Sequence, residues 1–131
     1  KKLLILSWLF VFGLLGCKTV EQSLVEQGYR ELNRDEITRM FIGNTDSTSA
    51  GELWYYSPDG QIRGKSKSGR SVSGKWRFNE TGKLCISWQD MYLPSGCSLF
   101  FLNDKTGDVV WVEPDGQNST SRILKGNPQN F

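Results

Sequence analysis

The stretch VSGKWRFNETGKLCISW, Val72 to Trp88, decides the fold. Two runs rich in aromatic and β-branched residues, VSGKWRF and KLCISW, flank the turn signal NETG. Such residues suit the pleated surface of a strand, and Asn and Gly are favoured in tight turns. The stretch therefore predicts an antiparallel hairpin.

The same pattern continues on both sides of this hairpin. From Gly51 onward, further strand-like runs, ELWYYS, CSLFFL and DVVWVE, are separated by turn signals such as SPDG, KSGR, DKTG and PDG. We expect seven or eight short strands in a mainly β fold. Curling this antiparallel meander into a small, lipocalin-like barrel or half-barrel would remove or shorten its exposed edges.

One short helix is predicted before the strands, in NRDEITRMFIGN, residues 33–44. Asn33 is a candidate N-cap, and Glu36 stands three residues later, as in a capping box. An apolar stripe follows at the spacing i, i+3, i+4, formed by Ile37, Met40 and Phe41. Because a helix of two turns must bury such a stripe, we expect it to pack on the sheet.

The beginning of the sequence has the pattern of an export signal. Lys1 and Lys2 precede LLILSWLFVFGLL, a run of thirteen residues that is apolar apart from Ser7 and Gly13. A membrane-spanning helix needs about 20 apolar residues, so this run has the length of a signal peptide. A short anchor helix or a buried core helix is the alternative.

The sequence LLGC, residues 14–17, resembles the lipobox of bacterial lipoproteins, in which the cysteine receives the lipid. We expect residues 1–16 to be a signal peptide, residues 17–31 to be the lipidated Cys17 and a tether, and residues 32–131 to be a single β-rich domain. The expected partner is a membrane, to which the lipid on Cys17 would anchor the protein. Two or three acyl chains make such an anchor stable. Lys18 after the cysteine resembles the pattern of outer-membrane lipoproteins, so we expect a bacterial envelope location facing the periplasm.

Composition argues against nucleic acid as a partner. Removing the predicted signal leaves 115 of the 131 residues, a length typical of one domain. Without Lys1 and Lys2, the 16 basic residues become 14, equal to the 14 acidic ones. The net charge of the domain therefore gives no reason to expect a polyanion such as nucleic acid as its partner.

Two cysteines remain after Cys17, namely Cys85 and Cys97. An even count in an exported protein predicts a disulfide. Two free buried thiols or a metal site are the alternatives, although the sequence has no histidine to complete a zinc site. Cys85 alternates with Leu84 and Ile86, so the bridge should lie on the opposite face of the strand from these apolar residues.

Several segments together resemble a known group of short exported bacterial proteins. They are EITRMFIGNT, YYSPDGQIRGK, GKWRFNETGKLCISW, the later GC and KGNP, between Leu32 and Pro128. They look like the domain-of-unknown-function family nine hundred and ninety-five. The resemblance implies an exported domain with a disulfide, and it implies no established activity.

No complete catalytic motif is present. Without histidine, Ser-His and Cys-His nucleophile pairs are excluded. DGQIRGKS lacks the spacing of a phosphate-binding loop. KSG and KTG resemble the third motif of penicillin-binding enzymes, but the sequence has no Ser-x-x-Lys motif to accompany them. Paired carboxylates from the turns stay an alternative. We expect a protein that is not an enzyme and has neither cofactor nor metal.

The segment RGKSKSGRSVSGKWR, residues 63–77, concentrates positive charge without one acidic residue. A hairpin that turns near Gly69 would gather these charges on one face and point Trp76 and Phe78 to the core. The six basic residues are Arg63, Lys65, Lys67, Arg70, Lys75 and Arg77. They form either a solvated face that prevents aggregation or an anion-binding face for an envelope component or envelope protein.

The sequence supports three functional hypotheses. The first is a lipid-anchored, non-catalytic module that binds a small or anionic envelope ligand. The second is an inhibitor of an envelope-directed hydrolase such as lysozyme, acting through a protruding loop with Tyr92 and Leu93. The third is a structural assembly subunit. An open barrel with a ligand-sized cavity would favour the first hypothesis.

Overall fold

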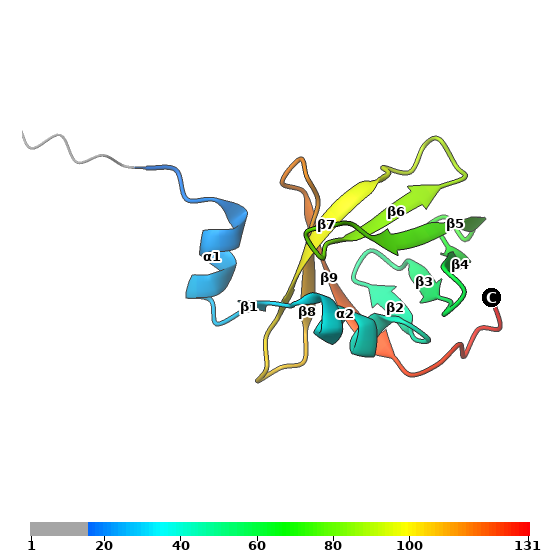
Figure 1. The fold of residues 1–131 in the computed structure, drawn as a ribbon, viewed down its shortest axis with the longest axis horizontal. Helices are drawn as coiled ribbons and strands as arrows, with labels where there is room; N and C mark the ends of the chain where they lie inside the picture. Colours follow the sequence, from blue (N-terminus) through cyan, green and yellow to red (C-terminus); the bar gives the residue numbers. More distant parts are fainter. Residues whose placement is uncertain (1–15) are drawn as a thin grey trace, which may run out of the picture.

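The structure, a computed structural model, describes residues 16–131 (Figure 1). Within this range the chain forms two helices, α1 (Val20–Glu26) and α2 (Arg34–Phe41). The strands are β1 (Arg30–Glu31), β2 (Thr45–Thr48), β3 (Leu53–Tyr56), β4 (Gln61–Lys65), β5 (Ser71–Phe78), β6 (Leu84–Trp88), β7 (Gly96–Leu102), β8 (Val109–Val112) and β9 (Asn118–Leu124). Neither described helix has the length and apolar character needed to cross a membrane.

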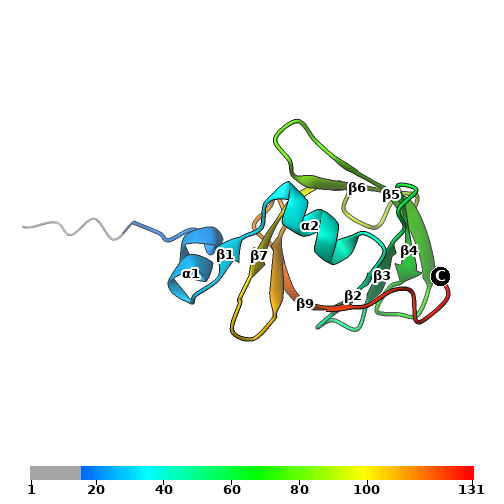
Figure 2. The same ribbon diagram turned by 60° about the horizontal axis from the view of Figure 1, so that its bottom comes forward.

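Strands β2 to β9 form a closed antiparallel barrel of eight strands (Figures 1 and 2). Strand β7 closes the sheet because its first half pairs with β6 and its second half pairs with β8. The short β1 continues the β6 side of β7, where Arg30 lies opposite Leu102. The predicted mainly β fold with a small barrel is therefore confirmed.

Helix α2 closes one end of the barrel, as Figure 2 shows by the position of α2 across the ring of strands. Ile37 and Phe41 on its inner face are buried. The ring of Phe41 packs edge-on against Tyr56 of β3 and Phe100 of β7, at centroid distances of 5.4 and 4.8 Å. The predicted capping box is present, since Asn33 Oδ1 accepts the Glu36 N–H and Glu36 Oε2 accepts the Asn33 N–H.

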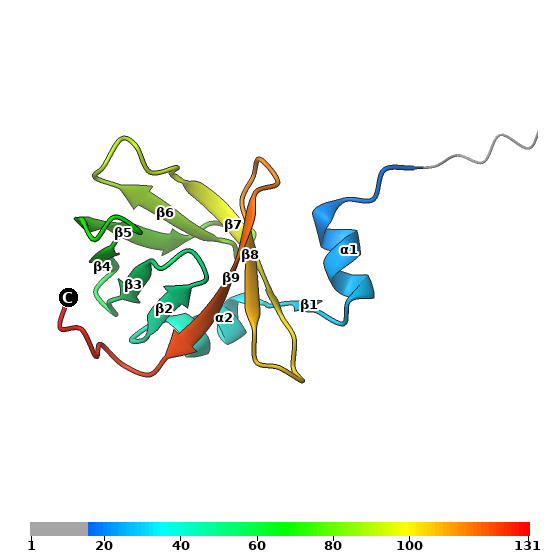
Figure 3. The same ribbon diagram turned by 180° about the vertical axis from the view of Figure 1, so that it is seen from behind.

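Helix α1 lies in the segment for which the sequence predicted only a tether. Thr19 caps it, and its Leu24 is buried on the outside of the barrel against Phe101, Val110 and Val112. Figures 1 and 3 show α1 outside the barrel on the β8 side. These three residues point outward from β7 and β8, and their apolar surface would be wet without the helix.

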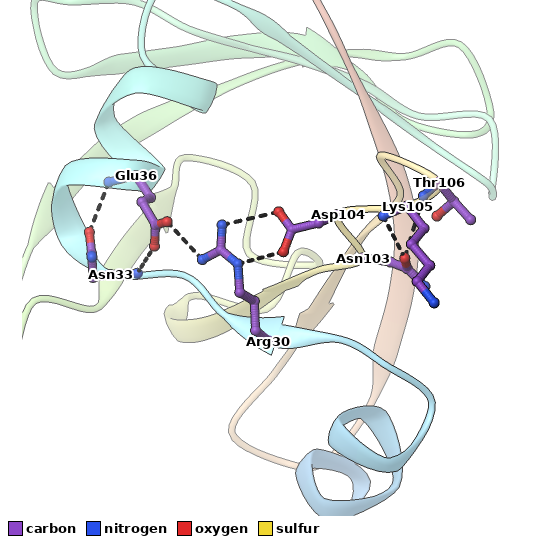
Figure 4. Close-up of polar contacts among 7 residues, drawn as sticks. All are labelled: Arg30, Asn33, Glu36, Asn103, Asp104, Lys105 and Thr106. Atoms are coloured by element: carbon purple, nitrogen blue, oxygen red, sulfur yellow. Dashed lines mark hydrogen bonds and ion pairs between the residues drawn. The ribbon is translucent and has the colours of Figure 1, made fainter.

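Arg30 connects the N-terminal segment to the barrel (Figure 4). Its guanidinium donates two hydrogen bonds to Asp104 in the β7–β8 loop, at 2.7 and 3.2 Å, and a third to Glu36 of α2, at 2.7 Å. The loop is itself ordered by Asn103 Oδ1, which accepts the backbone N–H of Lys105. The Arg30 guanidinium holds the pKa of the Asp104 carboxyl below its usual range. This junction fixes β1, α2 and the loop to one another.

The predicted disulfide between Cys85 and Cys97 is present. The two residues lie directly opposite each other on β6 and β7. Leu84 and Ile86 point into the core, so the bridge lies on the outer face of the barrel, as the alternation predicted. The alternatives of two free thiols or a metal site at these cysteines are therefore excluded.

Candidate ligand pocket

A cavity of about 310 Å³ occupies the end of the barrel opposite α2. Strand β3 begins at this end with Leu53 and reaches α2 with Tyr56. The cavity is lined by side chains of β3, β6, β7 and β8 and by the loops that follow β6 and β8. Its volume lies at the lower end of the range typical of small-molecule sites.

Two glycines make room for the aromatic wall of the cavity. Gly64 of β4 pairs with Trp54, and a Cβ atom at position 64 would lie 1.8 Å from the Leu53 carbonyl oxygen and 2.8 Å from the indole ring. Gly74 of β5 pairs with Trp88, and a Cβ atom there would lie 2.6 Å from the Ser87 carbonyl oxygen and 3.1 Å from that indole. The two indoles contact each other at a centroid distance of 4.7 Å. Inward-facing glycines thus let large rings fill one side of a narrow barrel.

The mouth of the cavity is acidic. It is lined by Glu52, which precedes β3, and by Glu113 and Asp115, which follow β8, whereas no lysine or arginine among residues 16–131 lines it. Partial burial raises the pKa of Glu113, and the nearby charges of Asp115 and Glu52 raise it further. Thr48 Oγ1 lies 3.4 Å from Glu52 Oε2 and donates a hydrogen bond to it. Negative charge therefore gathers where a ligand would enter.

Deeper in the barrel, Asp46 of β2 is buried with 1% of its surface exposed. Its side chain points inward, since Asp46 lies opposite Trp54 on one side and Ile123 on the other. Neither carboxyl oxygen has a hydrogen-bond partner among the described residues. Burial raises the pKa of Asp46 to about 7, and the charge of Glu52 adds to this shift. The hydroxyl of Ser121 opposes the shift without reaching hydrogen-bond geometry.

Further buried polar atoms in the barrel also lack a partner among residues 16–131. They are Trp54 Nε1, Tyr56 Oη, Trp111 Nε1 and Ser121 Oγ. Buried polar groups are normally satisfied by protein, water or a ligand. Together with Asp46, these residues come from two distant parts of the sequence, β2 and β3 on one side and β8 and β9 on the other. Nothing in the local sequence pattern therefore indicates that they meet. The segment TDST, which contains Asp46, has the polar composition of a loop.

The predicted basic residues do not line this cavity. Arg63, Lys65, Lys75 and Arg77 alternate with inward-facing residues of β4 and β5, so they lie on the outer face of the barrel. Trp76 and Phe78 pack against the core, as predicted. Lys67 lies in the exposed β4–β5 turn.

Arg70 and Arg63 of this basic segment are engaged in ion pairs. Arg70 binds Asp90 at 2.5 Å, and Asp90 belongs to the loop that follows β6 beside the cavity. Arg63 lies 3.9 Å from the Asp59 carboxylate. Within the described part of the chain, no ion pair involves Lys65, Lys67, Lys75 or Arg77, and these four residues form the free basic face.

Of the two residues expected to protrude from the loop after β6, Tyr92 is exposed and Leu93 is not. Met91 and Tyr92 are exposed by 87% and 80%. Leu93, in contrast, lines the cavity and packs against the core. The loop is held down by the Arg70–Asp90 pair and by Ser95 Oγ, which accepts the Trp88 N–H at 3.0 Å.

The predicted lipidation residue Cys17 is exposed and lies two residues before the Thr19 cap of α1. Residues 1–15, most of the predicted signal peptide, lie outside the described range. Among residues 16–131, no three His, Cys, Asp or Glu side chains lie close enough together to hold a metal ion.

Comparison with known proteins gives no relative. No family model matches the chain, and neither a curated protein nor a solved structure is significantly similar to it. Function must therefore be argued from the geometry of the barrel.

We expect Asp46 to make the stability of the protein depend on pH. The pKa of about 7 in the folded state exceeds the ordinary value of 3.8, so the stabilising contribution is complete below about pH 4 and is lost as the pH rises through 7. Urea unfolding between pH 4 and 7 should show a loss of about 1.4 kcal/mol per pH unit from this group. The Asp46→Asn variant should flatten that slope, whereas the exposed control Asp35→Asn should keep it. Parallel slopes for Asp46→Asn and the wild type would contradict the assignment.

Proposed function

We propose that this protein is a lipid-anchored, non-catalytic binding module of the bacterial envelope that holds a small ligand in the open end of its barrel. The observation that carries the proposal is the cavity of about 310 Å³ between Trp54, Trp88 and Trp111. Pre-formed concave sites with aromatic walls and a few polar groups are the usual form of small-molecule sites. The resemblance to the exported domain-of-unknown-function family is consistent with this role and stays a prediction.

The interior of the barrel supports this role. Helix α2 closes one end with Phe41, so a ligand would enter from the opposite end only. The glycines at 64 and 74 keep the indoles at their positions without a competing side chain. The side chains of Trp54, Trp88 and Trp111 would contact the apolar body of a ligand.

Filling the cavity should abolish ligand binding. Ser98 lines the cavity, so Ser98→Phe should lower the affinity for the neutral fluorescent probe prodan by at least about tenfold. Ser71→Phe adds the same ring to the exposed outer face of β5 and serves as the control. Fluorescence titration measures binding, and thermal unfolding verifies that both variants fold. Equal affinities of the two variants, or no probe binding by the wild type, would contradict the proposed site.

The described geometry also shapes the proposed lipid anchor. Only Lys18 separates Cys17 from the Thr19 cap, and α1 is held on the barrel by Leu24. The Arg30 junction then fixes the next segment to α2 and the β7–β8 loop. Acyl chains on Cys17 would therefore hold the barrel close to the bilayer, without a long flexible linker between them.

The anchor is tested by replacing its thiol. Cys17→Ala should abolish incorporation of radiolabelled palmitate and release the protein from the membrane fraction or leave an uncut precursor, because acyl burial supplies the membrane affinity. The wild type should carry the label in the outer-membrane fraction. Its failure to incorporate palmitate would refute the lipoprotein assignment.

The free basic face supports a second candidate function, binding of an envelope polyanion. Lys65, Lys75 and Arg77 share the exposed outer surface of β4 and β5 and make no described ion pair. Strand β4 lies four strands from β8 in either direction around the barrel. The face therefore points away from the side that carries α1 and Cys17, which favours a soluble polyanion over the lipids around the anchor.

Heparin chromatography separates this function from a merely solvated face. Replacing Lys65, Lys67, Lys75 and Arg77 by Ser should lower the salt concentration needed for elution, because fewer phosphate- or sulfate-type contacts release fewer counterions. Replacing the exposed Arg39, Lys83, Lys105 and Lys125 by Ser removes the same charge elsewhere and is the control. Elution of both variants at the same salt concentration would mean that only net charge matters.

The remaining alternatives stay predictions. Met91 and Tyr92 protrude beside the cavity and fit the requirement of an inhibitory loop. Leu93, however, is committed to the cavity wall. We therefore rank a hydrolase inhibitor below a small-ligand module, and a structural subunit below both.

A further inference from the structure

We propose that the ligand of the barrel is a small organic cation, an ammonium group on an apolar body. This inference rests on the proposed binding function and names its ligand class. It follows from the acidic mouth and the tryptophan walls of the cavity.

The charge of the mouth selects the sign of the ligand. Glu52, Glu113 and Asp115 line the entrance, and every other lining residue is uncharged. Charges beside a low-dielectric cavity act more strongly than they would in bulk water. An anion would therefore be repelled here, whereas an ammonium group would relieve the mutual repulsion of the three carboxylates.

The walls favour an organic cation. Trp54, Trp88 and Trp111 line the cavity, and tryptophan binds cations over its ring better than the other aromatic residues do. The carboxylates, in turn, do not converge closely enough to hold a metal ion. Negative charge spread around an aromatic cage suits a larger, partly apolar cation.

Unpartnered polar groups also lie behind the wall of the cavity. Trp54 is 2% exposed and lines the cavity, yet its Nε1–H has no acceptor. Directly across the ladder, Asp46 is buried and its carboxyl oxygens have no donor. Neither the Trp54 Nε1 atom nor Asp46 is reached from the cavity, so a cation in the cavity would compensate the Asp46 carboxylate through its electric field and not through a hydrogen bond.

The experiment compares three probes of nearly the same size: 2-phenylethylamine, 2-phenylethanol and phenylacetate. They present a cation, a neutral group and an anion on one phenyl ring. At pH 7.5 we expect calorimetry and tryptophan quenching to show binding of the amine about tenfold tighter than the alcohol, with phenylacetate weakest. Equal affinities for the amine and the alcohol would overturn the cation assignment and leave the binding function standing.

Charge-neutralising variants locate the effect. Glu113→Gln and Glu52→Gln keep the size of each side chain, and each should lower the affinity for the amine about threefold or more without changing that for the alcohol. Glu80→Gln, in the exposed β5–β6 turn, removes the same charge outside the cavity and should change neither affinity. An unchanged amine affinity in both mouth variants would refute the role of the acidic mouth. Binding of none of the three probes, together with failure of prodan to bind, would overturn the small-ligand function itself.

Discussion

The pairing of β7 with both β6 and β8 is the constraint on which the rest of the structure depends. It converts an open meander into a ring, so no strand of the ring keeps an unpaired edge. In the closed ring, the alternating side chains of each strand point in turn into the barrel and out of it. The positions of the cavity, the disulfide, the basic face and the surface that receives α1 all follow from this alternation.

A ring of eight strands encloses little more space than its own side chains need. Phe41 of α2 fills one end, and Gly64 and Gly74 yield space to Trp54 and Trp88 toward the other. The remaining volume lies at the end without a helix. Asp46 is the least favourable part of this interior, because its carboxyl group is buried without a hydrogen-bond partner. Burial favours the neutral form of this group over the charged one.

Local signals predicted the parts of the fold that local chemistry determines. The hairpin around NETG, the Asn33 capping box and the Cys85–Cys97 bridge depend on turn residues, a side chain three positions away and an even cysteine count. Helix α1 was missed because its burial depends on an apolar outer surface of β7 and β8 that exists only after the barrel has closed. The acidic lining of the cavity was not predicted for the same reason, since its carboxylates come from segments some 60 residues apart.

The closed barrel also keeps two surfaces of opposite charge apart. The carboxylates of the mouth lie at the end of the strands, whereas Lys65, Lys75 and Arg77 lie on the outer wall of β4 and β5. Arg70 is withheld from that wall, because its pair with Asp90 holds the loop that borders the cavity. A cation in the mouth and a polyanion on the wall would therefore contact different side chains and would not compete for the same charges. The net charge of the predicted mature chain conceals this separation, because the three carboxylates of the mouth and the three basic side chains of the wall cancel in the sum.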